Sequence, residues 1–201
     1  MSQSAKQSTI KDMTTGSPAK LILGFAIPML MGLLFQQFYS MVDTIIVGKF
    51  LGVDQLAAVG STGSINFLII GFCMGICSGF AIPIAQRFGA KDESGMRRCV
   101  ANSAWVSVIF AVVLTIVTVL LCRNILQWMR TPENIIDDAW MYIVIIFAGI
   151  PVTILYNLTS AIIRAMGDSK TPVYFLVMSA LLNIVLDLFC IPVSYTHLTL
   201  P

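Results

Sequence analysis

The chain has 201 residues, of which 57% are hydrophobic and 11% charged, and its formal net charge is +2. Soluble domains carry about 25% charged residues, so this composition excludes an ordinary soluble protein and predicts an integral membrane protein. The basic residues are scattered between apolar stretches, which argues against nucleic acid as a partner and leaves membrane lipid as an expected one. Residues 1–19 are polar, and the first apolar run is too long for a signal peptide, so no secretory signal is expected.

The first apolar stretch lies between Lys20 and Lys49, and Asp43 is the only charged residue among the 28 residues between them. A transmembrane helix needs about 20 apolar residues, so this stretch can cross the hydrocarbon layer with length to spare. Pro28 lies inside it, where a proline removes one backbone hydrogen bond and permits a kink. The pattern predicts a first span with a carboxylate inside the membrane.

Asp43 is part of a polar stripe on this helix. At 100° per residue, Gln36, Ser40 and Asp43 fall on one face, and Tyr39 lies beside them. An acid inside a span costs about 2.5–3.5 kcal/mol on insertion scales, so intramembrane acids are interpreted as functional by default. The stripe is therefore expected to face other helices or a water-filled cavity.

The second and third spans are expected at residues 56–86 and 99–121. The second span holds three glycines at four-residue spacing, which would give a smooth face for the close approach of another helix. They are Gly71, Gly75 and Gly79. Chance is the alternative explanation of this spacing.

The fourth span is expected at residues 139–163, with Pro151 and Asn157 inside it, and the fifth from about residue 172 to 192. Side chains at four-residue spacing give the fifth span a second polar stripe. The stripe consists of Ser179, Asn183 and Asp187.

Four places along the chain resemble helix starts. Ser17-Pro18, Thr131-Pro132 and Thr171-Pro172 each combine a capping side chain with a proline, which suits the first helical position. Asp54 is expected to cap the second span. These signals place the starts of the first, second, fourth and fifth spans.

The distribution of basic residues predicts the orientation. Nine of the twelve lie before the first span and in the loops after the second and fourth, and three lie in the other loops. Positive loops stay in the cytoplasm, so the N-terminus is expected inside and the end of the fifth span outside. We expect a cytoplasmic arm at residues 1–18 and a helical bundle at residues 19–193. Residues 194–201 continue no periodic pattern and resemble translated adaptor sequence, so we expect a non-native tail.

Two carboxylates within the spans, Asp43 and Asp187, are expected at comparable depth in the outer half of the membrane. In one dry site they cannot both stay ionised cheaply, so they are expected to share a proton or a cation. Together with Asn183 they would offer an oxygen-lined site that suits Na⁺. The alternative is that each acid bonds a neighbouring hydroxyl or amide and only fixes helix packing.

Signatures of enzymes and of resident metal sites are missing from the sequence. The single histidine, His197, lies in the doubtful tail, and no phosphate-binding Gly-x-x-x-x-Gly-Lys-Ser/Thr loop is present. The cysteines are odd in number and lie in or beside apolar spans, so we expect them to pack and not to form disulfides. They are Cys73, Cys77, Cys99, Cys122 and Cys190.

Three segments resemble one family of transporters. They are PMLMGLLFQQFYSMVDTIIVGKFLGVDQLAAVG from residue 28, NLTSAIIRAMGDSKTP from residue 157 and SALLNIVLDLFCIP from residue 179. In this order they are similar to the first lobe of multidrug and toxic compound extrusion (MATE) transporters. The resemblance implies an all-α, polytopic bundle with five of the six helices of one lobe. Helix six and a second six-helix lobe would be missing.

The resemblance also implies a role for individual residues. Cation coupling would fall to Asp43, Asn157, Asn183 and Asp187, with Na⁺ or H⁺ as the coupling ion and no other cofactor. Gln36 and Tyr39 would line the substrate cavity, and Pro28 would be the bending point of the first helix. A depth count from Arg164 places Asn157 nearer the cytoplasm than Asp187. The expected activity is export of cationic or amphipathic drug-like compounds across a bacterial inner membrane.

Three alternatives remain open from the sequence. An intramembrane aspartyl enzyme would carry each acid in a short motif such as Gly-x-Gly-Asp, and neither Asp43 nor Asp187 lies in one. A cation channel would be distinguished by a current measurement. A lipid-linked oligosaccharide flippase of the same superfamily would be expected to have a strongly basic cavity, but no basic residue lies inside a predicted span.

Overall fold

The computed structural model describes residues 16–50 and 52–199, and all regular structure in these ranges is helical. Side chains at 47, 50, 187, 188 and 190–199 lie outside the described part of the chain. The helices are α1 (Pro18–Phe50), α2 (Val53–Gly89), α3 (Glu93–Trp128), α4 (Ile136–Ala148), α5 (Ile150–Ala165) and α6 (Thr171–Thr199). The expected all-α bundle is confirmed.

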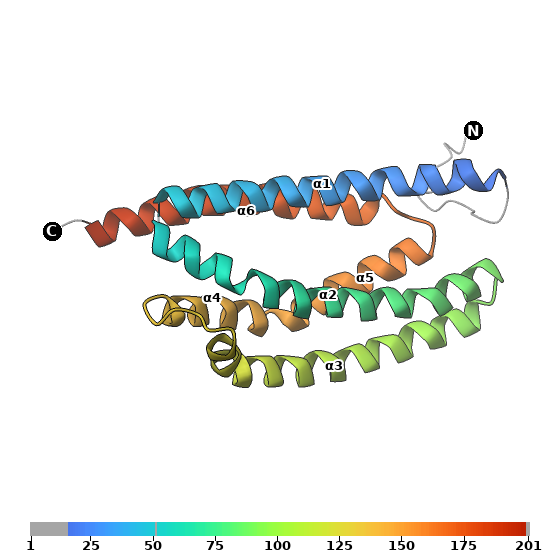
Figure 1. Cartoon of the computed structure of the whole chain (residues 1–201). Coiled ribbons are helices and arrows are strands. Elements are labelled where there is room, and N and C mark those ends of the chain that lie inside the picture. The colour runs from blue at the N-terminus through green and yellow to red at the C-terminus, as the bar shows by residue number, and fades with distance from the viewer. Residues whose placement is uncertain (1–15, 51, 200–201) are drawn as a thin grey trace.

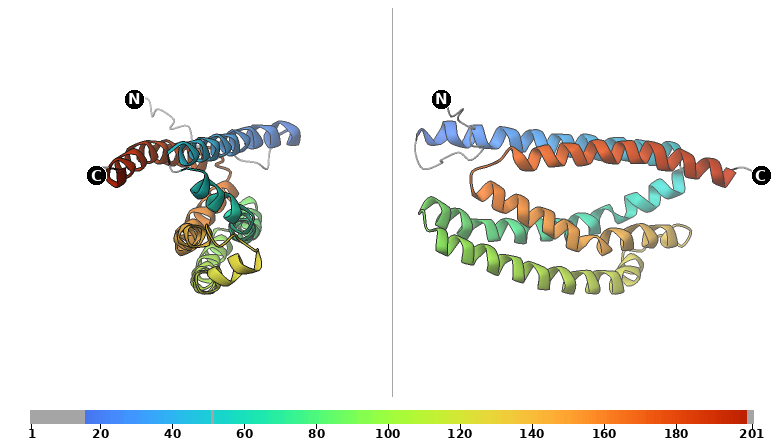
Figure 2. Two further views of the ribbon diagram at one scale, coloured as in Figure 1. Left: turned by 60° about the vertical axis from the view of Figure 1, so that its left-hand side comes forward. Right: turned by 180° about the vertical axis from the view of Figure 1, so that it is seen from behind.

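The helices form two groups. α1 and α6 run side by side in the same direction, and α2 to α5 pack together beneath them (Figure 1), an arrangement also visible from behind (Figure 2). The two groups meet where the chain connects them, at the α1–α2 and α5–α6 junctions. The parallel course of α1 and α6 agrees with the expectation that the first and fifth spans run in the same direction.

The buried core lies within the group formed by α2 to α5. Its most deeply buried side chains have 0–1% exposure and include Cys73, Cys77, Leu126, Ile143 and Phe147. In contrast, α1 exposes large apolar side chains along its length, for example Ile22 at 63% and Phe38 at 62%. Apolar surface of this kind suits contact with lipid or with further protein.

The predicted fourth span is two helices. α4 ends at Ala148, α5 begins at Ile150, and the pair is bent by 45°. Pro151 stands in the first turn of α5, where its missing N–H cannot donate to the carbonyl of Phe147 one turn earlier. The proline therefore breaks the helix close to Gly149 and bends the span.

By length and apolarity, three helices qualify as membrane spans within the searched residues, namely α1, α2 and α3. The bent pair of α4 and α5 makes a fourth when it is counted as one span. The apolar part of α6 that could be searched, Thr171–Leu186, falls below the length limit, although the α6 backbone continues to Thr199. The helix thus runs past residue 193, and the native or foreign origin of the tail stays a prediction.

Two predicted helix starts are confirmed and two are wrong. α1 begins at Pro18 and α6 at Thr171, as expected. Gly52, with φ of 98°, precedes α2, and Asp54 lies in the first turn instead of capping it. α4 begins only at Ile136, because residues 132–135 form a separate turn closed by the bond from the Ile135 N–H to the Pro132 carbonyl.

The glycine face predicted on α2 does not meet a helix in the described structure. A β-carbon placed on Gly71, Gly75 or Gly79 would find nothing within 4 Å among the described residues. The opposite face of α2 makes the contacts instead, and there Cys73 and Cys77 are buried and the Cys77 thiol approaches the Ile154 carbonyl of α5 at 3.8 Å. Cys73, Cys77 and Cys122 are buried and free, which confirms the packing role expected for them.

Most basic residues of the described chain lie at one end of the molecule. The start of α1 and the α2–α3 and α5–α6 turns lie at one end of the molecule, and the α1–α2 and α3–α4 connections at the other (Figure 1). The first end carries seven of the basic residues in the described chain: Lys20, Arg87, Lys91, Arg97, Arg98, Arg164 and Lys170. Lys49, Arg123 and Arg130 belong to the other end.

Candidate functional site

A hydrogen bond joins the polar stripes of α1 and α6. The Asn183 Nδ2 donates to the Tyr39 hydroxyl over 3.0 Å, although the two residues are 144 positions apart in the chain. Tyr39 is half-buried and Asn183 is exposed. The structure therefore brings together one residue expected to bind substrate and one expected to bind the coupling cation.

Asp43 lies one turn beyond Tyr39 on the same face of α1 and is half-buried. Across from it, the half-buried Tyr142 of α4 is near enough to interact electrostatically with the Asp43 carboxylate and with Tyr39. The Asp43 carboxylate is thus partly shielded from the surroundings and lies within electrostatic range of a second phenol. This is the placement expected of an acid that cannot face lipid cheaply.

Tyr142 was not a candidate in the sequence. It lies in an apolar helix whose other polar residues are near its start, and neither spacing nor composition relates it to Asp43. A tyrosine in a span needs a partner for its hydroxyl, which is a weak signal that many packing tyrosines share. Only the position of α4 relative to α1 in the folded chain relates Tyr142 to Asp43.

The remaining polar residues of the α1 stripe are more exposed. Gln36 is exposed, and so is Ser40, whose carbonyl accepts a 2.8 Å hydrogen bond from the Thr44 hydroxyl. Gln36 shares the Asp43 face but lies nearly two turns before it, toward the end where α1 begins. This position suits a surface beside the site and not a ligand within it.

Asn157 is not placed with Asn183. Its Nδ2 donates to the Thr153 carbonyl of its own helix at 2.8 Å. The neighbouring Tyr156 hydroxyl donates to the Pro172 carbonyl at 3.4 Å, so this part of α5 lies beside the start of α6. Asn183 lies 11 residues beyond Pro172, which corresponds to about 16 Å along the axis of α6. The depth expected for Asn157 from the sequence agrees with this placement.

Two further predicted site residues, Asp187 and Pro28, are located by their positions along α6 and α1. Asp187 is one turn beyond Asn183 on α6, and its side chain lies outside the described part of the structure. Pro28 is half-buried within α1, which continues without interruption through it. Among the side chains that the structure describes, no three of the His, Cys, Asp or Glu type are grouped as metal ligands.

The arrangement of these segments is that of a known family. Residues 28–189 match the family model MatE. The chain belongs to the MatE family. The matched range begins at Pro28, ends just beyond Asp187 and so includes the whole candidate site.

Named relatives and solved MATE structures agree with this assignment. The probable multidrug resistance protein YoeA of Bacillus subtilis (strain 168) is 38% identical over 162 residues, which cover 81% of this chain and 35% of YoeA. A MOP superfamily transporter from Pyrococcus furiosus is 31% identical with a TM-score of 0.80, over 86% of this chain and 38% of that one. A MATE structure in complex with MaD5 is 30% identical with a TM-score of 0.81, and the match covers 90% of this chain and 40% of that one. The chain thus spans well under half the length of these relatives.

MATE membership decides the general class of the protein. Relatives with the same helices are transporters, and several are named for multidrug resistance. A multi-pass membrane protein follows from the apolar helices together with these relatives. The Tyr39–Asn183 contact and the Asp43 carboxylate therefore belong to a segment of a MATE family transporter.

Proposed function

We propose that this chain is part of a secondary active multidrug antiporter, which exports cationic or amphipathic compounds in exchange for Na⁺ or H⁺. The observation that carries the proposal is the half-buried Asp43 carboxylate. It lies one turn from Tyr39, which accepts the hydrogen bond of Asn183, and within electrostatic range of Tyr142. An intramembrane acid held in this way can exchange a bound cation for a conformational bias. No enzyme activity is part of the proposal.

The Tyr39 contact orients the Asn183 amide for the role proposed for it. The Asn183 side-chain amide donates to the Tyr39 hydroxyl through its Nδ2. Its carbonyl oxygen therefore points away from Tyr39 and stays available as an acceptor. We propose that this oxygen, Asp43 and Asp187 receive the coupling ion. Oxygen ligands of this kind suit Na⁺, and the two carboxyl groups can alternatively share a proton.

Ion binding would act on the substrate side through α1. A cation at Asp43 removes repulsion between the acids and favours bending of α1 at Pro28, which moves Gln36 and Tyr39 relative to the rest of the lobe. The bound drug is thereby released. Because coupling free energies are reciprocal, drug binding must weaken ion binding by the same factor. The proposed role of Asn157 is indirect, since it lies near the start of α6.

Topology and completeness are further parts of the proposal. The end with seven basic residues is placed in the cytoplasm of a bacterial cell, so α1 and α6 run outward through the inner membrane. Two observations support a requirement for a sixth membrane span and a second lobe. α1 and α6 expose apolar side chains, and the chain covers about 38% of the solved MATE structures. Drug resistance of a sensitive host that expresses only these 201 residues would contradict this requirement.

The decisive test uses the full-length transporter in proteoliposomes with an imposed Na⁺ or pH gradient. Asp43→Asn and Asp187→Asn should each abolish gradient-driven efflux of a cationic dye while insertion and helicity stay at the wild-type level. Asp54→Asn, which changes an exposed acid at the start of α2, is the matched control and should keep wild-type efflux. Unchanged efflux with an unchanged ion dependence in either test variant would reduce that acid to a packing role.

A further inference from the structure

The outer face of α3 is a continuous exposed stripe. α3 lies at the edge of the bundle, on the side away from α1 and α6 (Figure 1). At 100° per residue, Trp105, Ile109, Val112 and Ile116 follow one line along the helix. Their exposures are 70%, 62%, 51% and 54%, so this line faces out of the described structure.

The stripe ends in an arginine on each side. Arg98 and Arg123 lie on the same line as Trp105, and none of the 24 residues between them is charged. Their separation of 25 positions corresponds to about 37 Å along the helix axis. The hydrocarbon layer is about 30 Å thick, so each guanidinium reaches the headgroup region of its own leaflet.

The arginine at the outer end already has partners. Arg123 Nη2 forms an ion pair with the Asp137 carboxylate at 2.9 Å, and its guanidinium lies 5.9 Å from the centre of the Trp140 ring. Because both partners belong to α4, Arg123 links α3 to α4. An external anion would have to compete with Asp137 for this arginine.

The basic residues at the inner end are not neutralised in this way. Lys91, Arg97 and Arg98 are exposed, and no ion pair found among the described side chains involves them. Glu93 lies one turn before Arg97 and is likewise absent from those ion pairs. Three positive charges therefore surround the start of the apolar stripe.

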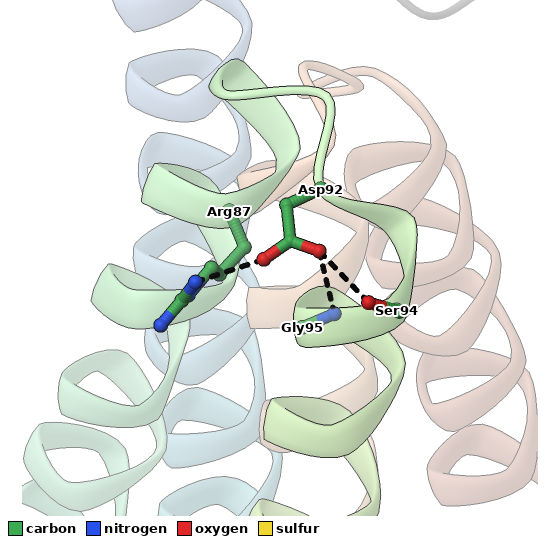
Figure 3. A network of polar contacts seen from close by, with 4 residues as sticks. All are labelled: Arg87, Asp92, Ser94 and Gly95. Carbon is green, nitrogen blue, oxygen red and sulfur yellow. Dashed lines mark hydrogen bonds and ion pairs between the residues drawn. The ribbon is translucent and has the colours of Figure 1, made fainter.

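Asp92, the acid in the adjoining turn, forms its hydrogen bonds within that turn (Figure 3). One Asp92 oxygen accepts from Arg87 Nη1 at 2.8 Å, and the other accepts from the Gly95 N–H at 2.9 Å and from the Ser94 hydroxyl at 3.0 Å. These bonds cap α3 and hold the turn in shape. Asp92 consequently compensates Arg87 and leaves the charge of Arg97 and Arg98 available.

We propose that the inner end of α3 binds an anionic phospholipid of the cytoplasmic leaflet. Its phosphate contacts Arg97 and Arg98 with Lys91 beside them, and its acyl chains lie along the exposed stripe through Trp105. Guanidinium groups bind phosphate through two parallel hydrogen bonds, and basic clusters beside a span attract anionic lipid. The inference rests on the membrane-spanning architecture of α3 and on the proposed cytoplasmic orientation of its N-terminal end, and it is independent of the efflux reaction.

Trp105 allows a direct test, because it lies seven residues, or about 10 Å, from Arg98 on the same line. In the full-length transporter, Trp128→Phe and Trp140→Phe, together with replacement of any tryptophan outside residues 1–201 by Phe, leave Trp105 as the only tryptophan. In phosphatidylcholine bilayers, brominated phosphatidylglycerol should quench its fluorescence at lower mole fraction than brominated phosphatidylcholine. Each basic residue near the surface contributes about 1 kcal/mol, which is roughly a five-fold preference. We expect an overall preference of roughly five- to 25-fold.

Matched variants separate the proposal from general charge effects. Arg97→Gln with Arg98→Gln should reduce the preference to about one, whereas Arg97→Lys with Arg98→Lys should keep most of it. Arg123→Gln, on the same line at the opposite end, should leave it unchanged. Equal quenching by the two lipids, an undiminished preference in the double glutamine variant, or an equal loss in Arg123→Gln would overturn the proposal. Displacement of the lipid by equimolar inorganic phosphate would overturn it in favour of a soluble anion site.

Discussion

The Asn183 amide donates a 3.0 Å hydrogen bond to the Tyr39 hydroxyl and thereby joins α6 to α1 in the middle of their parallel course. The bond links a residue proposed for ion coupling to one proposed for substrate contact. It fixes the orientation of the amide, and any movement of α1 against α6 must break or re-form it. Two predictions concern this contact and its surroundings, and two concern the α5–α6 turn and the membrane orientation.

Removing the Tyr39 hydroxyl should uncouple the two helices. Tyr39→Phe is expected to lower the free energy of unfolding by about 0.5–1.5 kcal/mol, the net worth of one hydrogen bond, and to weaken the ion dependence of efflux. A double-mutant cycle with Asn183→Ala, measured by thermal unfolding, should give a coupling energy of the same size. Tyr174→Phe changes an exposed tyrosine of α6 and should leave both measurements unchanged. Additive effects of Tyr39→Phe and Asn183→Ala would contradict the contact.

Tyr142 should influence the titration of the site without being needed for the fold. Its phenol interacts electrostatically with Asp43, so Tyr142→Phe is expected to shift the pH profile of efflux and to lower the rate at neutral pH several-fold. The ring stays in place, so the melting temperature should change little. A pH profile identical to that of the wild type would show that Tyr142 has no influence on the Asp43 site.

Asp168 should stabilise the α5–α6 turn in a pH-dependent way. Burial raises the pKa of this carboxyl, but hydrogen bonds from the Thr171 hydroxyl and the Thr171 and Lys170 N–H groups outweigh burial, with help from the Lys170 charge, and the pKa is lowered. A lowered pKa means that the stabilisation is complete above the ordinary value of 3.8 and is lost as the pH falls through the lower value of the folded state. Asp168→Ala is expected to cost about 0.5–2 kcal/mol at neutral pH, the usual range for a helix cap.

The Asp168 prediction has a matched series. Asp168→Asn keeps an acceptor for the cap, so it should cost less than the alanine variant and remove the pH dependence of this contribution. Glu93→Gln, an exposed acid at the same end of the molecule, should have no effect. Thermal unfolding from pH 7 down to pH 3 measures all four proteins. Equal stability of Asp168→Ala and the wild type at pH 7 would refute the cap.

The membrane orientation can be measured by cysteine labelling in a variant without native cysteines. Lys91→Cys and Lys170→Cys should react with an impermeant reagent only after the membrane is opened, whereas Asp54→Cys and Glu133→Cys should react in intact cells. All four positions are exposed. Ser169 is unsuitable, because at 6% exposure it would be protected on either side of the membrane. Labelling of Lys170→Cys from outside would reverse the orientation.

The sequence by itself determined where most helices lie and which face of α1 is polar. Apolar length and the charged flanks indicated the spans, and Pro18 and Thr171 marked two starts correctly because their local chemistry decides a helix start. The 3.6-residue period also relates Asp43 to Gln36, Ser40 and Tyr39 on any straight helix. Of these residues Asp43 and Tyr39 are half-buried, whereas Gln36 and Ser40 are exposed, so the interior placement of the whole stripe stays a prediction.

Only the tertiary structure decided what each face meets. The period of a helix defines a face but not its neighbour, so the glycines of α2 suggested a contact that α2 makes with its opposite side. The same limit hid Tyr142, because its closeness to Asp43 depends on where α4 lies relative to α1. Residues 144 positions apart, such as Tyr39 and Asn183, meet through the parallel packing of α1 and α6, which no local pattern encodes.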